Sequence, residues 1–233
     1  MNALPQPYNP HPSRWLPWPP ALLALLLASI LPELLLTLAD LGLAGPPYLR
    51  LMAYRLGSFQ PDLLNGQPRA VYAAQPTLMF LSYGVIHTGL LHLAGNMAAM
   101  LYLGRLTLER RSGRGLWGLY LVTTIGAAAM FALVGPPLAT MVGASGALFG
   151  LLGAWCVDSG LLAPRGPRSA PRPLMQFLNL LACAAALILC DIAGRLLLGT
   201  PVAWQAHTGG FLSGALFALA LPHRPPLRTA SPA

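Results

Sequence analysis

The sequence predicts an all-α membrane protein, a polytopic bundle of six transmembrane helices. Hydrophobic residues make up 55% of the 233 positions and charged residues only 9%, whereas a soluble domain carries roughly 25% charged residues. Because so few charges cannot cover a surface that faces water, lipid is the expected main solvent. Six apolar segments are each about long enough, at ~20 residues, to cross a bilayer as helices: 16–43, 77–103, 116–134, 142–162, 174–192 and 203–221.

These segments predict one six-helix membrane domain, 16–222, between two tails. The N-terminal tail, 1–15, is Pro-rich and polar, and it lacks the basic region, short apolar core and cleavage site of a signal peptide. The C-terminal tail, 223–233, is also Pro-rich, which is typical of disorder. We expect both tails to lie in the cytoplasm.

The arginines predict this orientation. The net charge of +8 comes from arginine alone, in short clusters between apolar segments rather than in a stripe that could bind nucleic acid. With the N-terminus in the cytoplasm, only Arg50, Arg55, Arg69 and Arg195 of the 14 arginines lie outside. This bias favours a multi-pass protein with both termini inside. Short loops without an organelle-targeting presequence suggest a bacterial inner membrane.

The first external connection, 44–75, is far longer than a common loop, and long loops are usually functional or disordered. Its stretch LRLMAYRL could form a short amphipathic helix at the membrane interface. Glu33 and Asp40, near the end of the first segment, suit either a structural role or a proton path. We favour the structural role.

Polar side chains inside apolar segments are expensive in lipid and are candidates for function. The second segment carries His87, His92 and Asn96, the fourth carries Ser145, and the sixth carries His207. Each also has a purely structural interpretation. A serine between glycines usually packs helices together, and a lone histidine can simply bond to a neighbouring helix.

Their depths favour a shared function. The second, fourth and sixth segments all run from outside to inside, which brings these residues to the outer side of the membrane. A serine needs a base to become a nucleophile, and His207 could accept the Ser145 proton. His92, Asn96 and the Ser145 N–H could donate hydrogen bonds to an oxyanion. No acidic residue is positioned to orient His207, so a Ser-His dyad is expected rather than a triad.

Three motifs carry a resemblance to a known family. HTGLLHLAGN, GASGALFG and AHTGGFLSG occur in this order on alternate predicted helices, and together they resemble the rhomboid family of intramembrane serine proteases. The resemblance covers roughly 77–221. It implies that Ser145 is the nucleophile and His207 the general base, and that His92, Asn96 and the Ser145 amide form the oxyanion hole. It also implies three supporting positions: Gly143, Phe149 and His87.

The resemblance further implies a long first external loop partly embedded in the membrane and a mobile cap over the site. It implies transmembrane protein substrates, cut in or near the bilayer. The sequence departs from the family at one point, because many members carry a Trp-Arg pair in that loop and no Trp precedes Arg69. The detailed conformation of the loop is therefore open, while the catalytic assignment is unaffected.

The leading hypothesis is thus a serine endopeptidase that needs no cofactor or metal and works in the lipid bilayer. One alternative is a catalytically inactive rhomboid-like protein that binds membrane clients, although such relatives usually lack the serine or the histidine. Another is a six-helix transporter that moves protons through its histidines, but this would leave the oxyanion donors unexplained. Cys156, Cys183 and Cys190 lie in apolar segments without metal-binding spacing, and we interpret them as buried hydrophobic residues.

Overall fold

The computed structural model describes residues 19–66, 69–136, 138–162, 173–198 and 203–221, and this part of the chain is helical, without a β-strand. The predicted all-α fold is therefore confirmed. The helices are α1 (Pro20–Asp40), α2 (Leu49–Gly57), η1 (Pro61–Asn65), α3 (Gln75–Ser82), η2 (Tyr83–Val85), α4 (Leu90–Leu108), α5 (Gly113–Val134), α6 (Ser145–Asp158), α7 (Pro173–Leu198) and α8 (Trp204–Ala220). The predicted tails, 1–15 and 223–233, lie outside the described residues.

Local sequence explains where several helices begin. α1 begins with Pro20, at a position where the missing N–H is not needed. α5 follows Ser112, whose hydroxyl accepts a hydrogen bond from the Gly115 N–H and caps the helix. α2 coincides with the stretch LRLMAYRL, so the expected short helix in the long connection 44–75 is present.

Two of the helices, α1 and α5, are each long and apolar enough to cross a membrane, among the residues that the structure describes. The second predicted segment, 77–103, is wrong as a continuous helix. It is divided into α3 with η2 and α4, which meet at 83° and could together make a third crossing. The break ends at Gly89, whose φ of +150° is a conformation that side-chain-bearing residues rarely adopt.

The fourth predicted segment, 142–162, is also too long, because its first residues belong to an extended stretch that other parts of the chain hold. Met141 pairs with Phe59 through two backbone hydrogen bonds of 2.9 Å, and the Gly143 N–H donates to the Tyr83 carbonyl at 2.9 Å. The helix therefore begins only at Ser145.

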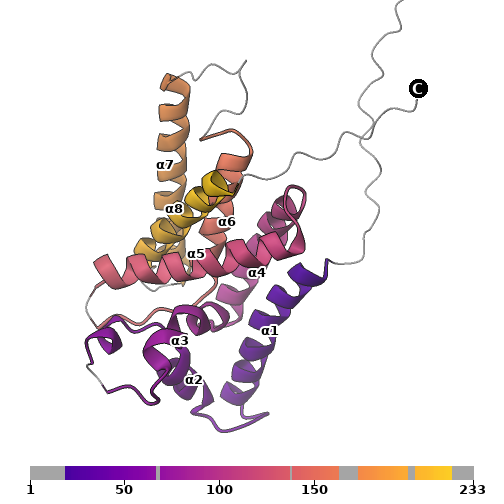
Figure 1. Ribbon diagram of the computed structural model, residues 1–233. Coiled ribbons are helices and arrows are strands. Elements are labelled where there is room, and N and C mark those ends of the chain that lie inside the picture. The colour runs from indigo at the N-terminus through magenta and orange to yellow at the C-terminus, as the bar shows by residue number, and fades with distance from the viewer. Residues whose placement is uncertain (1–18, 67–68, 137, 163–172, 199–202, 222–233) are drawn as a thin grey trace, which may run out of the picture.

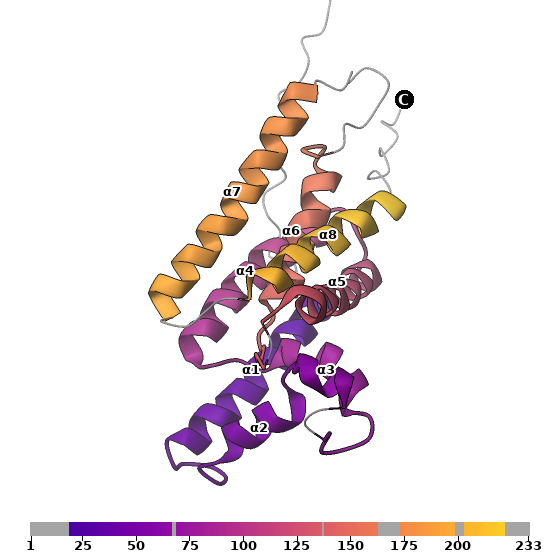
Figure 2. The same ribbon diagram turned by 90° about the vertical axis from the view of Figure 1, so that its left-hand side faces the viewer.

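Helices α5, α6 and α8 form the centre of the bundle, and α1 and α4 pack against them (Figure 1). Small residues allow α6 and α8 to touch through their backbones, because a Cβ at Gly210 or Gly214 would collide with the carbonyl of Gly146 or Gly150. Figure 2 shows α2 and α3 at one end of the molecule, while α7 extends toward the opposite end. The contact between α6 and α8 fixes which of their residues meet.

Candidate active site

The structure brings the Ser145 hydroxyl and the His207 ring together, although 62 residues separate them in the sequence. Ser145 is the first residue of α6, and His207 lies in the first turn of α8. Ser145 Oγ and His207 Nε2 are 2.9 Å apart, which is hydrogen-bond distance. The contact follows from the packing of α6 against α8, because the residue after Ser145 is Gly146, whose carbonyl lies against Gly210 of α8.

The ring of His207 is held in a closed environment. His207 is 5% exposed, and the ring of Phe149, one turn after Ser145 on α6, lies 4.3 Å from it between centroids at an angle of 32°. An aromatic neighbour at this distance restricts the orientation of the imidazole. Phe149 therefore packs directly against His207.

His92 and Asn96 lie one turn apart on α4, as their spacing predicts. Both side chains lie close to Gly143. A Cβ built at Gly143 would lie 2.9 Å from His92 Nε2 and 3.5 Å from Asn96 Nδ2. The φ of Gly143 is +114°, so glycine is favoured at this position by backbone conformation as well as by space. Asn96 is 7% exposed, and its Nδ2 has no hydrogen-bond partner among the described residues.

His87 lies within the predicted segment 77–103 but in the break before α4, which corrects the expectation that it lies on a helix. Its buried ring packs edge-on against His92, with 5.2 Å between centroids. Sequence reasoning missed Thr88, whose Oγ1 lies 3.1 Å from His92 Nδ1. Its position four residues before His92 is a signal that could have indicated this contact.

Ser145 and His92 both line two cavities. One, of about 600 Å³, lies under the loop between α5 and α6 and is lined by residues such as Thr140, Met141 and Trp204. The other, of about 550 Å³, is bounded by α4, α6, α7 and α8, and its lining is mainly apolar. The Ser145 hydroxyl is therefore reachable from the loop side and from between the helices.

Comparison with known proteins agrees with this arrangement. A family model described as "Rhomboid domain" matches residues 75–224, which is more than half of the chain. This chain belongs to the rhomboid family. It is also similar to "Rhomboid-like protein 11, chloroplastic" of Arabidopsis thaliana, with 40% identity over 72 residues, or 31% of this chain and 26% of that protein. The alignment thus spans about a quarter of the relative's length. Family membership and the apolar helices make this rhomboid an integral membrane protein with a helical bundle fold.

Proposed function

We propose that this rhomboid protein is an intramembrane serine endopeptidase that cleaves transmembrane-anchored proteins in or near the bilayer with a Ser-His dyad. The observation that carries the proposal is the distance of 2.9 Å between Ser145 Oγ and His207 Nε2. His92 and Asn96 are two further side chains with N–H donors. They extend from α4 toward Gly143, in the loop just before Ser145.

The reaction follows from the chemistry of these groups. The Ser145 hydroxyl attacks the scissile carbonyl while His207 Nε2 accepts its proton, and a tetrahedral oxyanion forms. When the intermediate collapses, the C–N bond breaks and His207 gives the proton to the leaving amine. Water then attacks the acyl-enzyme, again with His207 as the base, and releases the new carboxyl terminus and the free Ser145.

The negative charge of the oxyanion needs hydrogen-bond donors that are in place before the reaction. The Ser145 N–H is suited to this purpose, since the N–H of the first residue of a helix has no acceptor within the helix. The Asn96 amide is a second donor and the His92 ring a third. Gly143 and Phe149 support the site by shaping the loop and the His207 pocket, and His87 by packing on His92.

The cavity between α4, α6, α7 and α8 supports a transmembrane segment as substrate. Its apolar lining includes Leu91, Ala99 and Leu148, side chains that suit a hydrophobic chain better than a soluble peptide. A helical backbone has its carbonyls bonded internally, so the segment has to unwind locally before Ser145 can attack. The loop-side cavity is the complementary route for water.

Cleavage of a purified single-span model substrate in detergent tests the proposal. Ser145→Ala and His207→Ala should each lower kcat by roughly 10⁴-fold or more, and a fluorophosphonate should label only the chain that keeps Ser145. Ser159→Ala is the matched control, because its hydroxyl lies at the far end of α6. Cleavage that persists in Ser145→Ala would refute the nucleophile. A chain that retains the substrate without cutting it would instead be the inactive, client-binding alternative.

We also propose six membrane crossings, with both termini in the cytoplasm of a bacterial inner membrane. α6 and α8 have 14 and 17 residues, or about 21 and 26 Å at ~1.5 Å per residue, against a hydrocarbon core of ~30 Å. Short helices of this kind require a locally thinned bilayer.

In cysteine-free protein, Tyr48→Cys should react with an impermeant maleimide from outside, and Arg114→Cys only after the membrane is opened. The reverse pattern would invert the topology.

A further inference from the structure

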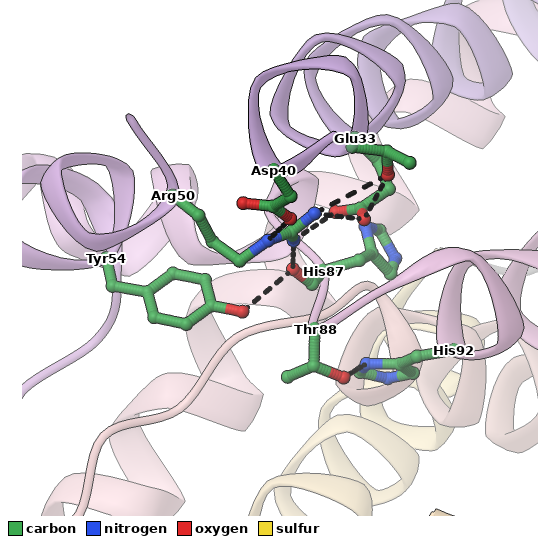
Figure 3. Close-up of polar contacts among 8 residues, drawn as sticks. Glu33, Asp40, Arg50, Tyr54, His87, Thr88 and His92 are labelled. Atoms are coloured by element: carbon green, nitrogen blue, oxygen red, sulfur yellow. Dashed lines mark hydrogen bonds and ion pairs between the residues drawn. The ribbon is translucent and has the colours of Figure 1, made fainter. Parts of the chain in front are cut away.

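Arg50, on α2, forms the centre of a polar cluster outside the proposed catalytic dyad (Figure 3). Its guanidinium forks onto Glu33, with Nη1 3.0 Å from Oε2 and Nη2 2.9 Å from Oε1, and its Nε donates to Asp40 at 2.6 Å. Nη1 also donates to the His87 carbonyl at 3.1 Å, and the Tyr54 hydroxyl donates to the same carbonyl at 3.1 Å. Arg50 thus joins α1, α2 and the break before α4.

The buried carboxylate of Glu33 explains the paired hydrogen bonds that it makes with Arg50. Glu33 is 0% exposed, and a charge in such a place requires a partner with matched geometry. Burial alone lowers the pKa of Arg50, but its hydrogen bonds to Glu33 and Asp40 raise this pKa above the ordinary value. A lysine could supply the charge but not the planar fork that reaches Glu33 and a carbonyl together.

The backbone that Arg50 holds carries two side chains that contact His92. His87 lies between helices, so its carbonyl needs partners from elsewhere in the chain. The His87 ring packs on the His92 ring, and the hydroxyl of Thr88 lies 3.1 Å from His92 Nδ1 (Figure 3). A shift of the peptide between His87 and Thr88 therefore moves both supports of the His92 ring.

The contact with Thr88 is compatible with a His92 ring that carries its proton on Nε2. When the Thr88 hydroxyl donates to Nδ1, the hydrogen of the neutral ring is on Nε2. Nε2 belongs to the edge of the ring that approaches Gly143, and His92 lines both cavities together with Ser145. This tautomer is the one that can donate to an oxyanion beside Ser145.

We propose that Arg50 is a positioning residue of the oxyanion hole: anchored on Glu33, it holds the His87 carbonyl and thereby directs the His92 Nε2–H toward the reacting centre. The inference rests on the proposed protease function. Arg50 itself touches neither the dyad nor the substrate, so its effect reaches the reaction only through His87, Thr88 and His92.

Kinetics on the full chain, with a single-span substrate, test this role. Arg50→Gln should lower kcat about tenfold or more with little change in KM, because loss of a whole oxyanion donor costs roughly 100- to 1,000-fold. Arg50→Lys and Tyr54→Phe should give smaller losses in the same direction. The matched control is Arg55→Gln, an exposed arginine on the same helix, which should keep the wild-type kcat.

A double-mutant cycle separates positioning from general destabilisation. In a His92→Ala background, Arg50→Gln should cause almost no further loss of kcat, because the group through which it acts is gone. Losses that multiply would overturn the proposal. If Arg50→Gln does not fold, Arg50→Lys, which keeps the charge but loses the planar fork, is taken through the same cycle together with Tyr54→Phe, and a wild-type kcat for both would equally overturn the proposal.

The two proposals fail in different ways. If wild-type protein does not cleave, or cleaves equally well with Ser145→Ala, the protease function fails and the role of Arg50 falls with it. If cleavage requires Ser145 while Arg50→Lys and Tyr54→Phe both keep the wild-type kcat, only the positioning role fails.

Discussion

Gly143 lies in the loop before α6, close to the His92 ring. Gly143→Ala should lower kcat by about tenfold or more, because a Cβ would lie 2.7 Å from His92 Cε1 and displace one proposed oxyanion donor. Gly66→Ala is the matched control, since Gly66 also has a positive φ, +74°, but open space around its Cβ position. Both variants place an alanine at positive φ, which costs about 1–3 kcal/mol, so equal kcat values would contradict the contact with His92.

Asn96 carries a buried amide whose hydrogens find no partner among the described residues. Asn96→Leu should therefore leave the thermal unfolding midpoint in detergent unchanged or raise it, because an unpaired buried donor costs about 1–3 kcal/mol. Its kcat should fall roughly 100-fold. Asn179→Leu should show the opposite pattern, a lower midpoint and normal kcat, because Asn179 Nδ2 donates to the Leu161 carbonyl at 2.8 Å.

Motifs and membrane depth single out Ser145, His207, His92 and Asn96 in the sequence as candidate site residues, but they do not single out Arg50. The sequence marks it only as one of four arginines on the predicted external side, and hydropathy gives no reason to separate it from Arg55. The missed signal lies in α1, where Glu33 is an acid inside an apolar segment and needs a cation. The first cation after it in the chain is Arg50. Which carbonyl Arg50 also holds depends on the tertiary fold and cannot be read from the sequence.

At the scale of helices, the contact between α6 and α8 determines whether the dyad forms. Gly210→Ala should place a Cβ against the Gly146 carbonyl, a backbone atom that cannot move aside. The helices must then separate, and we expect a loss of about 1–3 kcal/mol in the free energy of unfolding together with a marked fall in kcat. Gly118→Ala on α5 is the control, since its Cβ would meet only Phe217 at 3.9 Å. An unchanged kcat in Gly210→Ala would mean that the helices tolerate separation.

Helix positions could be predicted from hydropathy, whereas helix ends and breaks could not. The stretch 77–103 is apolar throughout, so its pattern resembles one span, and the 83° bend depends on Gly89 and on partners that lie far away in the sequence. The start of α6 was placed too early for a similar reason. Residues 142–144 are apolar or small, but hydrogen bonds of Met141 to Phe59 and of Gly143 to Tyr83 hold this part of the chain outside the helix.

At the scale of the whole molecule, a buried ion pair joins helices at the end of the bundle away from Ser145 and His207. Arg111, after α4, pairs with Asp158 at the end of α6 at 2.9 Å and donates to the Leu221 carbonyl beyond α8 at 2.8 Å. Both side chains are nearly buried, at 7% and 5% exposure. The pair therefore ties three helices together far from Ser145.

Asp158→Asn should destabilise the whole bundle by about 3–5 kcal/mol, because it leaves a buried guanidinium without its countercharge. Its kcat per folded molecule should stay near the wild-type value, since α6 separates Asp158 from Ser145 by ~20 Å. Thermal unfolding and single-turnover cleavage measure the two effects. The double variant Arg111→Met with Asp158→Leu should recover most of the stability. A Tm for Asp158→Asn equal to that of wild type would show that the pair is not essential.

The region matched by the family model begins at residue 75, yet the cooperative unit of this protein begins earlier. Leu22, Leu25 and Leu26 of α1 belong to the same apolar core as residues of α4, α5 and α6, and Arg50 belongs to α2. A chain trimmed to 75–224 would expose that core and lose the guanidinium behind His92. Transplanting the proposed activity onto another membrane anchor would accordingly require residues 20–74 to travel with the matched region, because Phe59 also bonds to Met141.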